Sequence, residues 1–389
     1  MNRSRLLAAV LAVLACLLVV LPALRPLPAV SQAARPEIRG VWMTLNDMAT
    51  LRDRSRMQEA VAKLAELNFN TLYPVAWNGG YAYYPSEVTQ REGIQRFTFR
   101  GLDGQDVLGE LIAEAHQRGL LVMPWFEFGF MAPPTSELAL RHPAWLTRKQ
   151  DGGKTSISAG GEVVWLNPFR PEVQKFITDL VVEIVSKYDA DGIQFDDHMS
   201  LPSEFGYDDY TLSLYSGETG RSPNSPQDPA WVRWRADRIS AFMERLHKAI
   251  EARRPNTIVS VSPNYYDFAY KLQLQDWLGW VRRRIVDEIV VQIYRSDMES
   301  FLPQLNRGEL GETRARIPTA IGIMSGQRTR PVPMELIGAQ VRAAREKGLG
   351  VAFFYFESLW NRAAEPPESR QAAFLELFPA PAPRGRPSA

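Results

Sequence analysis

The chain has 389 residues, of which 45% are hydrophobic, 11% aromatic and 23% charged, a composition typical of a folded globular protein. Its 45 basic and 44 acidic side chains give a formal net charge of +1, and the sequence contains no basic stripe. This balance argues against nucleic acid as a partner, and the length allows one large domain or two ordinary ones.

The first segment has the layout of a targeting signal. Arg3 and Arg5 precede an apolar run from residue 6 to 24, and small residues follow up to Ala33. This predicts a secretory signal peptide over residues 1–33, or an uncleaved membrane anchor, because the apolar run is also long enough to span a bilayer. We therefore expect an exported protein of the periplasm or cell envelope, either free or tethered to the membrane.

From residue 36 onward, short apolar runs alternate with longer amphipathic stretches. The runs predicted as strands are 38–44, 71–76, 120–126, 192–196, 258–262, 288–293, 319–323 and 351–356. They are rich in Val, Ile, Phe and Tyr and nearly continuous in apolar character, as expected of parallel strands that are covered on both faces.

Helical patterns lie between these runs. Apolar residues recur every three or four positions in 54–67, 107–118, 173–188, 231–253 and 333–347. Repeated strand–helix units predict an α/β fold, a single-domain (β/α)8 TIM barrel over residues 36–378. A doubly wound open sheet is the alternative, but no Gly-rich phosphate-binding fingerprint follows the first strand.

The connections are uneven in length. Long loops are predicted after strands 2, 3 and 4, and on a barrel all of them rise from the C-terminal face, where long loops are usually functional. They cover residues 77–103, 128–170 and 198–229. The Pro-rich tail 379–389 is predicted to be disordered.

Residues 189–198 form the most informative stretch, since an apolar strand ends there in two adjacent carboxylates, Asp196 and Asp197. Folding alone gives little reason for this pair, because neighbouring carboxylates repel and must be solvated or paired. In TIM barrels the catalytic groups lie at the C-terminal ends of strands. The plain alternative is an acidic turn.

Other strand ends add acids, amides and aromatic rings. Acids end the third strand (Glu127) and follow the eighth (Glu357), and the candidate substrate-binding residues are Trp42, Trp77, Trp125, Asn264, Gln292, Tyr294 and Trp360. Glycosidic cleavage needs such a set: one carboxyl protonates the leaving oxygen and another stabilises or bonds to the developing oxocarbenium carbon. The tryptophans fit a core role equally well. No metal site is predicted, because none of the four His is spaced as a ligand pair, and no cofactor motif is present.

Several motifs together carry a family resemblance. Ile-Arg-Gly-Val-Trp at the first strand, Asp-Gly-Ile-Gln-Phe-Asp-Asp at the fourth, Val-Ser-Pro at the fifth and Gln-Ile-Tyr at the sixth make residues 36–378 similar to the glycosyl hydrolase-like family ten of bacterial envelope proteins. The resemblance implies a glycoside hydrolase barrel related to amylase-type barrels. Some relatives are similar to enzymes that cut peptidoglycan glycan strands from which the stem peptides have been removed.

The resemblance also implies roles for individual residues. Asp196 matches the nucleophile of the amylase-type Asp-Gly-Phe-Arg-x-Asp pattern, although Gln194 stands where that pattern has Arg. The fifth strand carries Ser-Pro-Asn where those barrels have their acid Glu. The general acid is therefore Glu357, which matches a family Glu after the eighth strand, or Glu127. Asp197 is expected to bind a hydroxyl or tune charge.

These observations together predict an exported glycoside hydrolase that acts on a cell-envelope polysaccharide by a carboxylate-pair mechanism. Two alternatives remain open from the sequence: a non-catalytic glycan-binding barrel, favoured by the departures at Gln194 and the fifth strand, and an amylase-like hydrolase of α-glucans.

Overall fold

The computed structural model describes residues 35–94, 104–158, 161–327, 329–361 and 363–384. The chain from residue 36 onward clusters into one compact unit. The predicted signal segment 1–33 lies outside the described residues. None of the described helices is long and apolar enough to cross a membrane.

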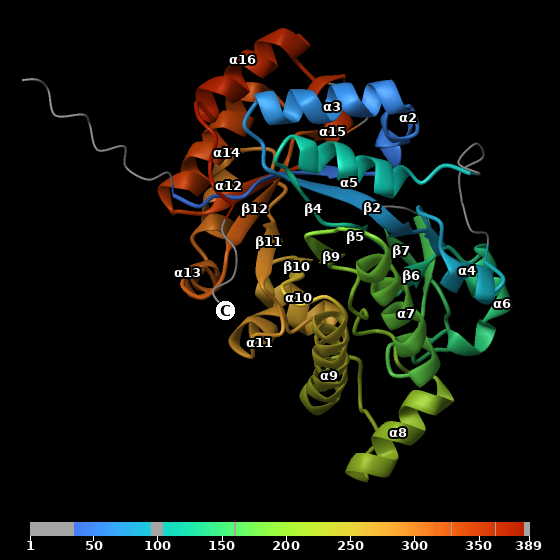
Figure 1. Cartoon of the computed structure of the whole chain (residues 1–389). Coiled ribbons are helices and arrows are strands. Elements are labelled where there is room, and N and C mark those ends of the chain that lie inside the picture. The colour runs from blue at the N-terminus through green and yellow to red at the C-terminus, as the bar shows by residue number, and fades with distance from the viewer. Residues whose placement is uncertain (1–34, 95–103, 159–160, 328, 362, 385–389) are drawn as a thin grey trace, which may run out of the picture. The chain divides into compact units, whose positions relative to one another are not determined.

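Parallel strands close into the predicted barrel (Figure 1). Around the ring they are β1 (Arg39–Met43), β2 (Thr71–Asn78), β4 (Leu121–Val122) with β5 (Trp125–Phe126), β9 (Gly192–Asp196), β10 (Ile258–Ser262), β11 (Glu288–Gln292), β12 (Thr319–Met324) and β15 (Gly350–Phe354). The ring is closed because β1 pairs in parallel with both β2 and β15. All the predicted strands are present, with β4 and β5 forming the third.

The third strand is interrupted at Pro124, which has no backbone N–H to donate to a neighbour. Hydrogen bonds nevertheless continue on both sides of the break. The Met123 N–H donates to the Leu72 carbonyl at 2.9 Å, and the Pro124 carbonyl accepts from the Gln194 N–H at 3.0 Å. The strand therefore still places Glu127 at its C-terminal end.

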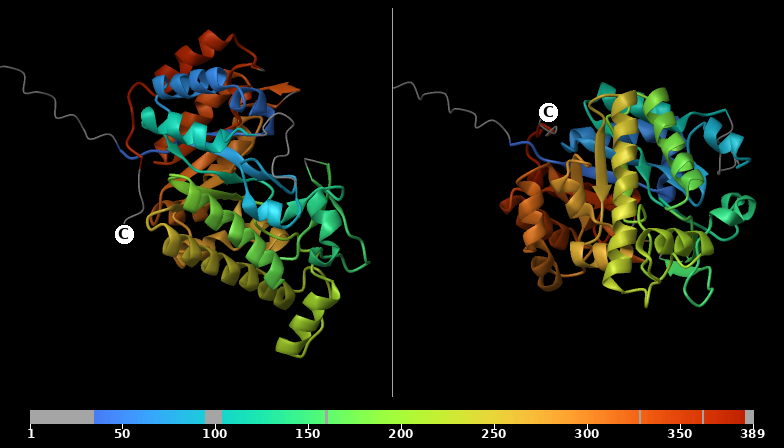
Figure 2. Two further views of the ribbon diagram at one scale, coloured as in Figure 1. Left: turned by 45° about the vertical axis from the view of Figure 1, so that its right-hand side comes forward. Right: turned by 90° about the horizontal axis from the view of Figure 1, so that it is seen from below.

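Helices surround the strands, as both views of Figure 2 show. The helices predicted from periodicity are α3 (Arg54–Glu66), α5 (Val107–Gln117), α7 (Pro171–Lys187), α9 (Pro229–Arg253) and α14 (Met334–Glu346). The remaining helices on this ring are α2 (Met48–Leu51), α10 (Tyr266–Gln273), α11 (Trp277–Arg282), α12 (Met298–Leu305), α13 (Gly308–Arg314), α15 (Phe356–Trp360) and α16 (Pro367–Leu377), with the 3-10 turn η1 (Leu45–Asp47). Side chains of Asp53, Asp106 and Asp228 accept backbone N–H groups at the starts of α3, α5 and α9, which explains why those helices begin there.

The long loops after strands 2, 3 and 4 carry small elements of their own on the C-terminal side of the barrel. They hold β3 (Tyr81–Ala82), α4 (Glu87–Arg91), β6 (Met131–Ala132), α6 (Glu137–Arg141), η2 (Pro143–Trp145), β7 (Ser156–Ser158), β8 (Gly161–Trp165) and α8 (Asp209–Thr219). A further hairpin, β13 (Gly326–Gln327) and β14 (Arg330–Pro331), follows β12. Helix α8 projects away from the barrel (Figure 1).

The C-terminal segment differs from the predicted disorder over its described part, residues 379–384. The Arg39 guanidinium donates to the Ala380 carbonyl at 2.7 Å. The Arg384 side chain enters the barrel and pairs with Glu288 of β11, and the two side chains are only 5% and 1% exposed. Proline content predicted a free tail, but one buried ion pair and the backbone contacts hold this segment in place.

Candidate active site

Adjacent strands gather most of the predicted polar residues at one end of the barrel. Asp196 ends β9, Glu127 directly follows β5, and Gln292 ends β11, while Asn264 lies shortly after β10. Since these strands are parallel neighbours, their C-terminal ends meet at the same rim. The structure thus brings together acids and amides that lie up to 165 positions apart in the sequence (127 to 292).

Each of the two adjacent aspartates has its own amide donor. The Gln292 side chain donates to Asp196 Oδ1 at 2.5 Å, and the Asn264 side chain donates to Asp197 Oδ2 at 2.6 Å. The side chain of Asp196 is 7% exposed and that of Asp197 is 16% exposed. The amides therefore fix the direction of both carboxylates while leaving a small part of each accessible.

Glu127 joins this pair from the neighbouring strand. The Asn78 side chain at the end of β2 donates to its carboxylate, and His198 Nδ1 lies 2.8 Å from its backbone carbonyl oxygen. Gly129 permits this approach of the two loops. Its φ is +49°, and a Cβ there would lie 2.3 Å from the His198 carbonyl oxygen.

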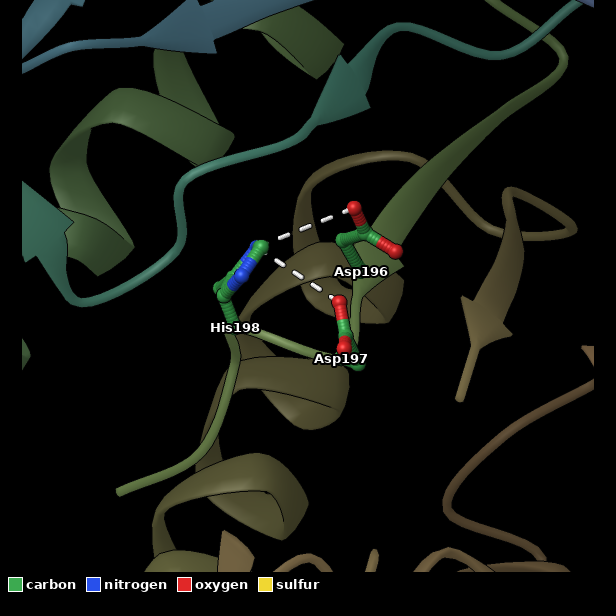
Figure 3. A group of neighbouring side chains, drawn as sticks. All are labelled: Asp196, Asp197 and His198. Carbon is green, nitrogen blue, oxygen red and sulfur yellow. Dashed lines mark ion pairs between the residues drawn. The ribbon is translucent and has the colours of Figure 1, made fainter. Parts of the chain in front are cut away.

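His198 lies beside both aspartates (Figure 3). Its Nδ1 is 3.8 Å from Asp196 Oδ2 and 3.5 Å from Asp197 Oδ1. Ligand atoms of the three residues lie within 4.8 Å of one another, close enough to share a metal ion. The Nδ1 atom is already directed at the Glu127 carbonyl. This leaves Nε2 as the ring nitrogen that could join the two carboxylates, and the described residues add no further acid, His or Cys to the group.

The acids strongly influence one another. Burial raises the pKa of Glu127 to about 7, against the opposing hydrogen bond from Asn78. Burial, followed by the charges of Asp197 and Glu127, raises the pKa of Asp196 well above its usual range. Like charges this close do not all ionise together, so the cluster retains a proton near neutral pH.

Tyr294, two residues after β11, also belongs to this rim. Burial, and then the charges of Asp196, Asp197 and Glu127, raise the pKa of its phenol well above its usual value. The hydroxyl therefore stays protonated and can donate a hydrogen bond. Its ring lies 5.4 Å from that of Phe354, centroid to centroid. The predicted residues Asn264, Gln292 and Tyr294 all lie around the acids.

The predicted sugar-binding tryptophans Trp42, Trp77 and Trp125 lie in the core instead. They are at most 2% exposed. The Trp42 indole N–H donates to Gln194 Oε1 at 2.6 Å, and the Trp77 indole N–H donates to the Gly129 carbonyl at 3.1 Å. The structure gives these rings the packing role that the sequence left open, since no ring face is open to a ligand.

Glu357 and Trp360 lie on α15, which follows β15. Strand β15 is four strands from β9 in either direction around the ring, so Glu357 lies on the opposite side of the C-terminal rim from Asp196. Its backbone N–H donates to Asp47 Oδ1 at 2.7 Å, and burial raises the pKa of Asp47 to about 7. These residues line a separate hollow of about 820 Å³ between α3 and α15–α16. The structure therefore groups Glu127, not Glu357, with Asp196.

Two members of the site were absent from the predicted set. Asn78 was missed because the second strand was predicted to end at residue 76, whereas β2 continues to Asn78. Had the strand been extended, the same search of strand ends would have found it. His198 is outside the predicted set because its spacing from the other His argued against a metal site, and its contact with the Glu127 carbonyl leaves no signal in the sequence.

Comparison with known proteins identifies the family and the fold of this chain. The model of the family described as glycosyl hydrolase-like 10 matches residues 37–342. The chain belongs to this family. It is a glycoside hydrolase by family, and the resemblance predicted from the strand motifs is confirmed.

Curated relatives carry matching names. The chain is 26% identical to glycosyl hydrolase DigH of Escherichia coli (strain K12) over 309 residues, which cover 69% of this chain and 67% of DigH. It is 24% identical to glycosyl hydrolase YngK of Bacillus subtilis over 248 residues, which cover 55% of this chain and 44% of YngK.

Solved structures confirm the fold. The glycoside hydrolase domain of PgaB (BpsB) from Bordetella bronchiseptica superposes with a TM-score of 0.65 at 14% identity, covering 87% of this chain and 99% of that domain. Alpha-L-fucosidase isoenzyme 2 from Paenibacillus thiaminolyticus gives a TM-score of 0.63 at 17% identity, covering 88% of this chain and 49% of the other. At such identities the likeness concerns architecture alone.

Proposed function

We propose that this protein is an exported glycoside hydrolase that cleaves bonds within a cell-envelope polysaccharide, with glycan strands of peptidoglycan freed of stem peptides as the leading candidate. The observation that carries the proposal is the group of Asp196, Asp197 and Glu127 at one rim, each acid held by an amide donor. Export rests on residues 1–33, and the choice of polymer rests on the family resemblance.

In the proposed reaction Glu127 is the general acid. Its pKa of about 7 lets it hold a proton at the pH where the leaving glycosidic oxygen needs one. The proton moves to that oxygen as the bond to the anomeric carbon breaks. The Asn78 amide and the His198 contact keep the carboxyl and its backbone in place during the transfer.

Asp196 is the proposed nucleophile. Its carboxylate, oriented by Gln292, bonds to the anomeric carbon as the oxocarbenium character develops. Water then attacks that carbon as its bond to Asp196 breaks, the Asp196 carboxylate leaves, and the water gives a proton to Glu127, which restores both acids. A proton on Glu127 also removes one of the charges that raise the pKa of Asp196, so protonation of one acid favours ionisation of the other.

Asp197 is the proposed hydroxyl-binding partner. The Asn264 amide holds one carboxylate oxygen, and the side chain is more exposed than that of Asp196. It can therefore accept a hydrogen bond from a sugar hydroxyl while its charge keeps the pKa of Asp196 raised. The Tyr294 hydroxyl is the corresponding donor.

The test measures reducing ends released from purified sacculi that an amidase has stripped of stem peptides. Asp196→Asn and Glu127→Gln should each lower the rate by at least about a thousandfold, while Glu357→Gln, a matched change on the opposite side of the barrel, should keep the wild-type rate. Undiminished turnover in Asp196→Asn would refute the assignment.

The same assay separates the alternative functions. Turnover of α-glucans but not of stripped glycan strands would instead identify an amylase-like hydrolase. Binding to glycan without turnover of any polymer would identify a non-catalytic barrel. Cell fractionation of the full chain tests export, and an exclusively cytoplasmic protein would contradict it.

A further inference from the structure

A second hollow lies on the loops that follow β5 and β9, outside the group of acids. Its volume is about 550 Å³, and its lining includes Arg148, Gln150, Asp151, Tyr207, Leu212 and Ser222. We call it the distal hollow. Both of its loops begin at the acids, one at Glu127 and the other at Asp197, so it belongs to the same face of the barrel.

Packed side chains connect the acids with the distal hollow. The ring of His198 lies 6.1 Å from that of Trp165, and Trp165 lies 6.4 Å from Phe205, centroid to centroid. The ammonium of Lys149 is 5.4 Å from the centre of the Phe205 ring. Lys149 precedes the turn 150–152 that lines the hollow, and Trp165 and Phe205 are only 3% and 0% exposed, so buried packing holds the two loops together between the acids and the hollow.

The walls of the distal hollow are held by hydrogen bonds rather than by loose loops. The Lys149 N–H donates to the Gly153 carbonyl at 2.8 Å, and the Gly153 N–H donates to Asp151 Oδ1 at 2.9 Å. The Tyr207 N–H donates to the Arg148 carbonyl at 2.9 Å, and Arg148 Nε donates back to the Tyr207 carbonyl at 3.2 Å, which joins the two loops at the hollow. Such a preformed site loses little entropy on binding.

An aromatic group supports the hollow from below. Tyr207 packs against Trp231 with ring centroids 5.9 Å apart, and Trp231 packs against Tyr215 at 4.7 Å. Tyr207 and Trp231 are 5% and 0% exposed, and the Trp231 indole N–H faces the Tyr207 hydroxyl, so this aromatic group supports the hollow from within the fold.

The polar groups of the lining suit a sugar without net charge. Arg148 is 41% exposed and donates to the 90% exposed Asp209 at 2.6 Å, so its charge is already balanced. One amide (Gln150), one carboxylate (Asp151) and one hydroxyl (Ser222) complete the set. Hydroxyl and acetamido groups offer both donors and acceptors to these side chains, whereas a polyanion would face uncompensated acids.

We propose that the distal hollow binds sugar units of the polysaccharide some distance from the bond that is cleaved. The identity of the ligand rests on the proposed function, but binding itself does not require cleavage. A long glycan strand held at the acids would extend over the loops that follow β5 and β9 to the hollow, which makes the enzyme prefer polymers to short oligosaccharides.

The experiment uses the full chain with Asp196→Asn, so that strands are bound without being cut. Binding of amidase-stripped glycan strands is measured by co-sedimentation. Adding Arg148→Ala and Gln150→Ala should weaken binding about tenfold, because charged and amide hydrogen bonds to the strand are lost. Arg282→Ala is the matched control, since Arg282 also pairs with an exposed acid, Glu312, away from the loops after β5 and β9.

In the active enzyme, the ratio of kcat/KM for long strands to kcat/KM for a tetrasaccharide of the same glycan should fall about tenfold with the Arg148→Ala/Gln150→Ala change. Binding as tight as in the control, or no binding of strands by the Asp196→Asn protein, overturns the inference. Binding that depends on the hollow in a wild-type enzyme that releases no reducing ends would refute the proposed function while supporting the distal hollow.

Discussion

Asn78 gives a direct way to test whether Glu127 is the acid. Its side-chain amide donates to the Glu127 carboxylate, and this bond lowers the Glu127 pKa against the larger upward effect of burial. The change Asn78→Leu keeps a similar volume but removes the donor. Because the lost bond favours the ionised form, the variant should have a higher Glu127 pKa than the wild type.

The size of the shift follows from the strength of the bond. A hydrogen bond to a charged group contributes about 1.5–3 kcal/mol, and about 1.4 kcal/mol corresponds to one pKa unit. The Glu127 pKa should therefore rise by about one to two units from its value of about 7. At pH 8 the wild type should retain roughly a tenth of its maximal kcat/KM, whereas the variant should retain more than half.

The assay is the pH dependence of kcat/KM on stripped glycan strands. The alkaline limb should move upward in Asn78→Leu while the acid limb changes little. Gln58→Leu is the control, since it removes a hydrogen bond from a side-chain amide to Glu114. That bond is 3.2 Å long and distant from the barrel rim. An alkaline limb that stays in place or moves downward would show that Glu127 is not the proton donor.

Other changes test the remaining parts of the structure. The pKa of Asp196 is raised in the folded protein, so ionisation of this group destabilises the fold at pH values above its pKa in the unfolded chain, about 4. Asp196→Asn should therefore raise Tm by a few degrees at pH 8 and by less at pH 4. Replacing Gln194, which accepts from the Trp42 indole inside the barrel, by Met should lower the free energy of unfolding in urea by about 1–3 kcal/mol. Arg384→Met leaves Glu288 buried without its cation and should cost about 3–5 kcal/mol in the same measurement.

Matched changes at exposed positions provide the controls. Gln105→Met and Arg282→Met should each change the free energy of unfolding by less than about 0.5 kcal/mol. An Asp196→Asn protein with a lower Tm at pH 8 would contradict the cost assigned to the buried acid. Similar values for Arg384→Met and Arg282→Met would contradict a structural role for the C-terminal segment.

Much of the site follows from strand ends alone. Asp196, Glu127 and Gln292 were predicted because each lies where an apolar run stops, and parallel strands bring such positions together. The choice between Glu127 and Glu357 depends on distance around the ring. In a barrel with sequential neighbours the third strand adjoins the fourth and the eighth lies opposite, so this part was also implicit in the sequence.

Other features depend on packing that no local pattern shows. Trp42 and Trp125 lie near strand ends like the acids, but their rings turn into the barrel, where their centroids are 6.3 Å apart. Tyr73 packs against Trp42 at 5.4 Å and Phe354 against Trp125 at 6.4 Å. Gln194 is explained by that same interior, because its amide accepts from Trp42 and donates to Ser260 at 3.0 Å. The fixed position of residues 379–384 depends on one side chain, Arg384, which a Pro-rich composition does not reveal.

The position of Arg384 bears on when the fold can form. The barrel closes only when β15 joins β1, and its interior ion pair needs a residue 30 positions beyond the end of β15 (354 to 384). During synthesis the early strands leave the ribosome first, but they have no closing partner until almost the whole chain has emerged. The ring of strands therefore cannot close before the residues of β15 have been synthesised.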